Sequence, residues 1–253
     1  MGRVQWDQDG QREYQTGTDR GMVYSLNSDG SYGVKSNDST SFGVAWNGLT
    51  GVTQSPSGAE SNAIYADNIK YLNLLSAEEF AFTITAYTYP DEFEQCDGSA
   101  DLTPGVSVGQ QKRRKFGFSY RNLIGNDTDG NDHGYEINCI YGAQAGVSER
   151  AHTTVNDSPE AVELSWECST TPVAVGKIGD KTYKPTSIVK INSTDFTTDD
   201  AKAKLASFED IIYGRDADST ADPNVTALEP TLPLPAAIYA HFTGNEVTQH
   251  AAG

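Results

Sequence analysis

The sequence lacks any long apolar run. Nowhere in its 253 residues does a stretch approach the roughly 18 to 20 consecutive apolar residues that a membrane-spanning helix requires. The first 20 residues are polar and lack the apolar centre of a secretory signal peptide. We therefore expect no membrane partner and a protein that is assembled in a cytoplasm.

Basic residues are scarce. Against 35 Asp and Glu the chain has 18 Lys and Arg, which gives a formal net charge of −17 and a pI of about 4.4. A protein that clamps DNA through its phosphates needs clustered basic side chains, so this composition excludes such a role. With 37% hydrophobic residues the chain has enough apolar material for a core, and its length suits one large all-β domain or two smaller ones.

The sequence has few cysteines, and their spacing matches no paired motif. The three, Cys96, Cys139 and Cys168, form no CxxC motif. An odd number without such spacing predicts neither a disulfide framework nor a zinc site. Buried, reduced thiols are the expectation.

Most of the chain has the pattern of β-strands. Apolar and polar residues alternate with a period of two, which predicts strands with one buried and one solvent-facing side. The alternating stretches are 80–87, 116–121, 135–141 and 162–169, with a shorter run at 188–191.

One segment, 198–213, has the pattern of a helix. Leu205, Phe208 and Ile212 recur at helical spacing, and Gly214 follows in the position that favours a left-handed residue. Thr197 or Thr198 can cap the first turn. The predicted fold class is therefore mainly β, a β-sandwich or barrel with one flanking helix and long loops.

We find no internal repeat and no linker between residues 43 and 214, so we predict one domain spanning 1–240. The strand and helix patterns that support this domain best lie in residues 40–214. Four of the ten prolines fall after residue 215, which predicts an extended arm over 215–240. Residues 241–253 are expected to form a flexible tail.

No convergent catalytic or metal site is evident. Glu163 and Glu167 share a face, but four residues of strand separate them by roughly 13 Å, beyond the about 5 to 9.5 Å of glycosidase pairs. No His lies at metal-ligand spacing from another His or Cys, and no nucleophile elbow or phosphate-binding loop is present. We expect a protein that is not an enzyme and binds no cofactor.

The segment 126–132 is similar to a calcium loop. If Asp127 takes the first ligand position, Asp132 stands where glycine is needed and Asn138 where glutamate is needed. A plain turn between two strands explains the segment better, with weak calcium binding as the alternative.

The one basic cluster comprises Lys112, Arg113, Arg114 and Lys115. One interpretation is a charged start of a strand that blunts a sheet edge. A second is an inter-subunit patch that meets an acidic patch on a neighbouring copy. Contact with nucleic acid is a third.

Several strings of the sequence resemble the major tail tube protein of long-tailed bacteriophages. The resemblance covers roughly residues 40 to 240. The strings are GVAWNGLTGV at 43–52, SPSGAE at 55–60, YADNIKY at 65–71, AYTYPDEF at 86–93, CDG at 96–98, FGFSYR at 116–121, GNDTDG at 125–130, HGY at 133–135, VNDSPEA at 155–161, SWE at 165–167 and LPLP at 232–235.

The resemblance implies a structural virion protein without catalytic residues or cofactor. Proteins of this family form hexameric rings that stack into a hollow tail, and inner strands from six subunits line the channel. The implied partners are further copies of the chain and the tape measure, tail terminator and tail tip proteins. DNA would be a transient cargo, because an acidic wall repels it within a Debye length of about 8 Å.

A β-sandwich recognition module, such as a sugar-binding or tail-adhesin domain, is the alternative. It predicts exposed aromatic side chains on one face. Trp6, Trp46 and Tyr65 are the aromatic residues that the strand pattern leaves unplaced.

Overall fold

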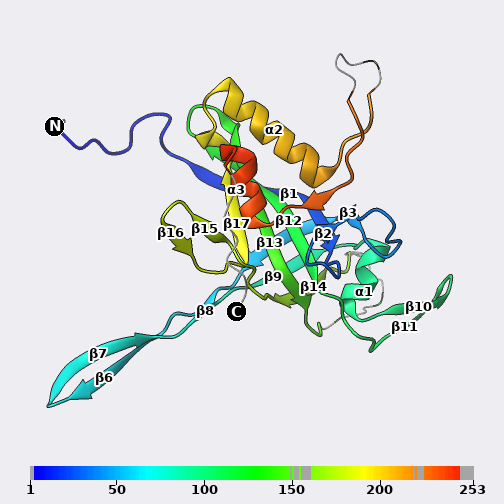
Figure 1. Ribbon diagram of the computed structural model, residues 1–253, viewed down its shortest axis with the longest axis horizontal. Helices are drawn as coiled ribbons and strands as arrows, with labels where there is room; N and C mark the ends of the chain where they lie inside the picture. The colour runs from blue at the N-terminus through cyan, green and yellow to red at the C-terminus, as the bar shows by residue number, and fades with distance from the viewer. Residues whose placement is uncertain are drawn as a thin grey trace.

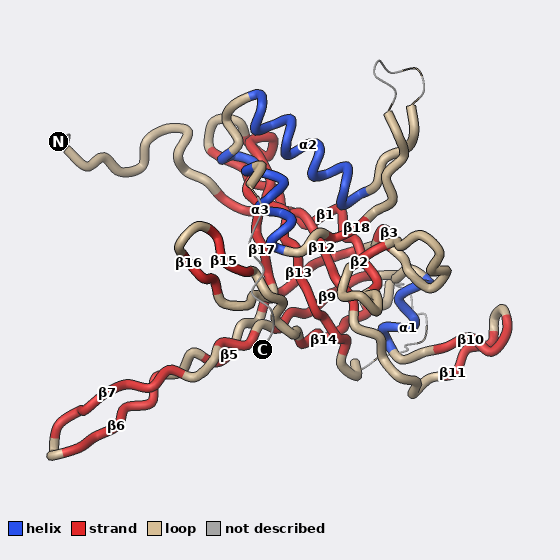
Figure 2. Tube along the Cα trace, viewed as in Figure 1, coloured by secondary structure: helices blue, strands red, loops and turns tan. Residues whose placement is uncertain are grey.

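Two antiparallel β-sheets that share one long strand lie at the centre of the structure (Figures 1 and 2). The computed structural model describes residues 3–148, 150, 154, 161–218, 220 and 225–245. The strands of the first sheet are β1 (Tyr14–Ser25), β3 (Gly43–Ala45), β12 (Phe116–Asn126), β13 (Gly130–Ala145) and β17 (Ile188–Asn192), and those of the second are β4 (Leu49–Gln54), β9 (Ala81–Ala86) and β14 (Leu164–Ser169). The first sheet has the order β3-β1-β12-β13-β17 and the second β14-β9-β4. The predicted mainly-β fold class is confirmed.

Strand β13 passes from the first sheet into the second at Gly142. Most of β13 pairs with β12 and β17, whereas Gln144 and Ala145 pair with β14. Gly142 has φ +59°, and a Cβ there would lie 2.2 Å from the Thr171 carbonyl oxygen. Glycine therefore permits the bend that joins the two sheets.

Aromatic side chains fill the space between the sheets. The Trp166 ring is fully buried, and its centroid lies 5.3 Å from that of Trp46 and 5.7 Å from that of Phe93. Phe93 comes from the 3-10 helix η1 (Asp91–Phe93), which continues into α1 (Glu94–Asp97). Phe82 and Phe118 belong to the same core, as the alternation in their stretches predicts.

A second core lies on the other face of the first sheet, under helices α2 (Asp199–Tyr213) and α3 (Pro235–Thr243) (Figure 1). Its fully or nearly fully buried members are Met22, Tyr24, Tyr32, Ile137, Cys139, Tyr141, Ile191, Leu205, Phe208, Ile212, Leu232 and Ile238.

The expectation of a solvent-facing side is wrong for β12 and β13. Ser119 alternates with Phe118 and Tyr120, and Asn138 and Ile140 alternate with Ile137, Cys139 and Tyr141, yet all of these side chains are buried. Because the first sheet lies between the second sheet and the helices, both faces of its central strands are covered. The buried Ser119 hydroxyl has a partner, the Tyr24 hydroxyl at 3.0 Å.

Helix α2 confirms the predicted helix. The Thr198 Oγ1 accepts a hydrogen bond from the Ala201 backbone N–H at 3.2 Å, and Gly214 follows the helix with φ +81°. The Tyr24 hydroxyl donates to the Ile212 carbonyl at 2.8 Å. This bond ties the last turn of α2 to β1.

The C-terminal region corrects the predicted arm. Instead of continuing as an extended arm, the chain forms β18 (Thr231–Leu232), which pairs with β2 (Tyr32–Gly33), and then α3. Pro235 occupies the first turn of α3, where its missing N–H costs nothing, and Ile238 is buried. Residues 241–243, expected in a flexible tail, belong to this helix, and 246–253 lie outside the described residues.

Short hairpins extend from the sheets (Figure 1). They are β6 (Ser61–Ala66) with β7 (Ile69–Leu75), preceded and followed by β5 (Ser57–Gly58) and β8 (Glu78–Glu79), then β10 (Ala100–Thr103) with β11 (Val106–Val108), and β15 (Gly176–Ile178) with β16 (Lys181–Tyr183). The 3-10 helix η2 (Ser193–Asp195) precedes α2. The segments 97–111 and 170–184 each contain one of these hairpins.

Over the described ranges, no helix combines the length and apolarity that crossing a bilayer requires. His152, His250 and residues 155–160 of the VNDSPEA string lie outside these ranges.

Candidate assembly surfaces

Exposed apolar side chains gather on a hairpin arm, residues 57–79, formed by β5, β6, β7 and β8. It projects away from the two sheets (Figures 1 and 2). Tyr65 is 69% exposed, Tyr71 67% and Leu75 71%. The large apolar side chains exposed along the arm are Ile64, Tyr65, Ile69, Tyr71, Leu72, Leu74 and Leu75. Apolar surface gathered in this way marks a site of interaction.

Local chemistry explains the shape of the arm. Asp67 and Asn68 connect β6 to β7 with φ of 50° and 58°, as in the two-residue turns that match the twist of a hairpin. The pairing steps from Ile64 with Leu72 to Tyr65 with Lys70, so Tyr71 bulges from the ladder. Sequence reasoning missed this hairpin, although its turn type and its β-branched and aromatic residues were a readable signal.

Most of the basic cluster faces the body of its own chain. Arg113 Nη1 donates to the Ala145 carbonyl at 2.8 Å. Arg114 donates to the Leu26 carbonyl at 3.1 Å and to the Thr40 carbonyl at 2.6 Å.

The other two members differ in exposure. Lys115 Nζ donates to the Thr171 hydroxyl at 2.8 Å, whereas Lys112 is exposed. The structure thus brings Arg113 and Arg114 together with backbone carbonyls and Lys115 with a hydroxyl. The inter-subunit patch stays a prediction, in which Lys112 is the member most open to a partner.

The 126–132 segment contains the turn between β12 and β13, at residues 127–129, as its first interpretation predicts. Asn126 Oδ1 accepts from the Thr128 N–H at 3.1 Å, while Asp127 accepts from the Gly10 N–H at 3.0 Å. The hydrogen bond from His133 lowers the pKa of Asp129. The turn therefore anchors the N-terminal segment, a contact that the sequence pattern does not reveal.

The remaining candidates stay apart. Glu163 and Glu167 are both exposed, and Glu163 accepts a hydrogen bond from the Thr50 hydroxyl. His241 contacts the Lys204 carbonyl at 2.8 Å between α3 and α2. In the described part of the chain, His, Cys, Asp and Glu form no group of three or more that could hold a metal ion.

All three cysteines are free and buried, as the sequence predicts. Burial raises the pKa of the Cys96 thiol to about 12 and that of the Cys139 thiol to about 12. Burial also raises the pKa of Cys168. Thiols in such surroundings are unreactive.

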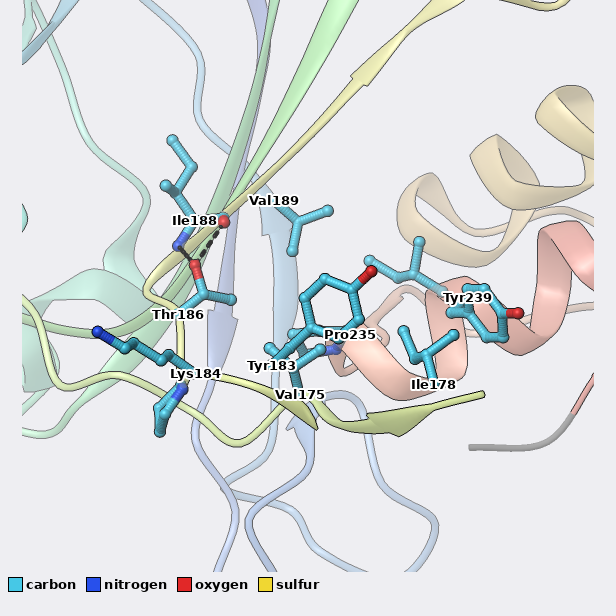
Figure 3. Close-up of a pocket in the computed structure, with 11 residues that line it drawn as sticks. Val175, Ile178, Tyr183, Lys184, Thr186, Ile188, Val189, Pro235 and Tyr239 are labelled. Carbon is cyan, nitrogen blue, oxygen red and sulfur yellow. Dashed lines mark hydrogen bonds between the residues drawn. The ribbon is translucent and has the colours of Figure 1, made fainter. Parts of the chain in front are cut away.

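A groove of about 640 Å³ lies between the β15–β16 hairpin, β17 and α3 (Figure 3). Thr186 fixes one wall, since its hydroxyl donates to the Ile188 carbonyl at 2.9 Å. The apolar lining includes Ile178, Tyr183, Val189, Pro235, Ile238 and Tyr239. The groove depends on α3, so sequence patterns did not reveal it.

Comparisons with known proteins found structural likeness but no sequence match. No family model and no curated protein matches the sequence. Among solved structures, a chain from a cryo-EM structure of the anti-feeding prophage baseplate, 6-fold symmetrised, is similar at 9% sequence identity and a TM-score of 0.33. The likeness covers 68% of this chain and 92% of that chain. At this TM-score it carries no argument about function.

Proposed function

We propose that this protein is a structural virion subunit that assembles into stacked hexameric rings, the tail tube of a long-tailed bacteriophage. The observation that carries the proposal is the exposed apolar hairpin arm. The resemblance of the strings between residues 40 and 240 to tail tube proteins supports the same function. The protein would be assembled in the host cytoplasm and reside in the virion.

The exposed apolar side chains of the arm favour contact with a partner. A two-stranded hairpin alone is marginally stable in water. Fully burying one large apolar side chain contributes about 1.5–3 kcal/mol, and seven such side chains are exposed on the arm. Covering them supplies on the order of 10 kcal/mol, comparable with the about 4–15 kcal/mol cost of association.

The geometry of such a contact favours assembly into rings and tubes. An arm that leaves one copy and contacts a different surface of the next makes a heterologous contact. Repeated contacts of this kind close into rings or continue as filaments. The arm is therefore suited to a repeating assembly.

The net charge of −17 suits a channel for DNA. Acidic side chains on the channel wall would repel the phosphates and prevent DNA from sticking as it passes. Within this proposal, DNA is a cargo without specific binding. The tape measure, tail terminator and tail tip proteins are the further partners.

Electron microscopy of the purified protein tests the proposal. We expect rings or tubes under assembly conditions. Replacing Tyr65, Ile69 and Tyr71 by Ser should reduce the sedimentable assembled fraction about tenfold or more, because it removes anchors worth more than about 1.4 kcal/mol.

The matched control replaces Leu102 and Val106 on the β10–β11 hairpin by Ser. These two side chains are 71% and 50% exposed. This variant should assemble like the parent. Protein that stays monomeric under all assembly conditions contradicts the proposed function. An arm variant that assembles normally contradicts the role of the arm.

A recognition module is the second candidate, because Trp6, Tyr65 and Tyr71 are exposed aromatic side chains. Trp46, by contrast, lies in the core. Tyr65 and Tyr71 lie on the arm and Trp6 in the N-terminal segment, so they do not form one flat platform (Figure 1). Specific binding on a glycan array would favour this candidate.

A further inference from the structure

We infer that the groove between the β15–β16 hairpin, β17 and α3 receives the hairpin arm of a second copy of this chain. The inference deepens the proposed self-assembly, on which it rests, by naming the surface that covers the arm. Two observations carry it: the chemistry of the two surfaces and their opposite local charges.

The groove offers an apolar receptor for the arm. Its volume of about 640 Å³ falls within the about 300–1,000 Å³ of pockets that bury most of a bound group. Figure 3 shows Tyr183, Ile178, Pro235 and Tyr239 among the residues that line it. Tyr side chains at the end of the arm are suitable anchors, because large aromatic groups dominate the energetics of interfaces.

The occupant is not the arm of the same copy. Tyr65 and Tyr71 remain about two-thirds exposed, at 69% and 67%, so their own groove does not cover them. The arm also extends away from α3 and from the groove that α3 helps to form (Figure 1). A second copy has the same groove free to receive the arm.

The charges at the two surfaces are complementary. Residues 57–79 carry four acidic groups and one basic group, a local charge of −4 + 1 = −3, with Glu60, Glu78 and Glu79 at the base of the arm. Residues 176–184 carry three lysines and one aspartate, a local charge of +3 − 1 = +2.

All three lysines beside the groove, Lys177, Lys181 and Lys184, are exposed, and so are the three glutamates of the arm. In a chain of net charge −17, two copies generally repel each other. A local positive surface next to the apolar groove therefore attracts the arm, with its local charge of −3, as it approaches, while the aromatic side chains at its end supply the contact.

Thiol cross-linking between copies tests the inference. One variant carries Ile69→Cys on the arm, and the other carries Tyr183→Cys at the groove. The native thiols are buried, so they compete little for a short bis-maleimide. Mixed under conditions in which microscopy shows assembled particles, the two variants should form a cross-linked dimer.

The matched control replaces Ile69→Cys by Leu102→Cys, an exposed position on the β10–β11 hairpin. We expect at least about tenfold less dimer, since random encounters lack the stabilising contact. A single chain carrying both Ile69→Cys and Tyr183→Cys should give a ladder of multimers.

The outcomes separate the two proposals. Assembled particles without the arm–groove dimer overturn the inference and leave the proposed function standing. Absence of both particles and dimer counts against both. Cross-linking of the doubly substituted chain without a gain in mass shows that the arm occupies its own groove, which overturns the inference. An equal amount of cross-linked dimer from the Leu102→Cys control also overturns the inference.

Discussion

Single buried hydroxyls connect the layers of this protein. Tyr24 on β1 is fully buried, and its hydroxyl donates to the Ile212 carbonyl while lying 3.0 Å from the Ser119 hydroxyl. Burial raises the pKa of Tyr24 well above its ordinary value. One phenol thus holds the last turn of α2 on the sheet, because an unpaired carbonyl there would be costly.

The variant Tyr24→Phe tests this role. We expect the free energy of unfolding to fall by about 1–3 kcal/mol, because the substitution leaves the Ile212 carbonyl without its donor in a buried place. Urea unfolding measures the change. The control Tyr87→Phe, at a side chain that is 55% exposed, should stay within about 0.5 kcal/mol. Equal effects of the two variants would contradict the role of Tyr24.

Among the elements, the basic segment before β12 has members with different surroundings. Arg114 reaches two loop carbonyls and lies over the Phe42 ring, with 5.7 Å between the guanidinium carbon and the ring centroid. Lys112, two residues earlier, is exposed. Charge in this segment therefore acts within the fold at one position and is open to a partner at another.

Charge reversal at these two positions separates the roles. Arg114→Glu should lower the free energy of unfolding by about 1.5–3 kcal/mol, because the charged hydrogen bonds from the guanidinium to the Leu26 and Thr40 carbonyls are lost. Lys112→Glu should change it by no more than about 0.5 kcal/mol and instead reduce assembly, if the patch meets an acidic neighbour. Thermal unfolding and sedimentation measure the two effects. Normal assembly of the Lys112→Glu protein would remove the inter-subunit role.

For the molecule as a whole, buried phenols limit the stability of the folded protein at high pH. Burial raises the pKa of six tyrosines across both cores: Tyr24, Tyr32, Tyr120, Tyr135, Tyr141 and Tyr213. For Tyr135 the pKa rises to about 12, with a further contribution from the carboxylate of Glu209. The folded protein therefore holds these protons more tightly than the unfolded chain, whose tyrosines titrate near pH 10.

The raised tyrosine pKa values predict how the stability of the fold changes at alkaline pH. A raised pKa in the folded state gives a contribution that is full below about pH 10 and is lost as the pH rises toward about 12. The melting temperature should therefore be steady at neutral pH and fall steeply above about pH 10. Thermal unfolding followed by circular dichroism, together with tyrosinate absorbance, measures this. A melting temperature that does not change across that range would contradict the assignment.

The candidate surfaces were only partly predictable from the sequence. The basic cluster is visible as four consecutive residues, but which members face inward depends on loops that lie 74 and 88 residues away. The arm has a local signal in its Asp67–Asn68 turn. The exposure of the arm has no such local signal, since apolar and aromatic residues of this kind also occur in a strand buried in a sheet.

By itself, the sequence determined the strands β9, β12, β13, β14 and β17, the capped helix α2, the buried reduced thiols and the acidic charge, because these follow from local periodicity, local capping and composition. Only the tertiary structure decided that β12 and β13 are covered on both faces, that a proline-rich segment becomes α3, and that a groove forms beneath it. The physical reason is that burial is a property of contacts between distant segments. A period of two shows which side chains share a face, but what covers that face depends on where the rest of the chain packs.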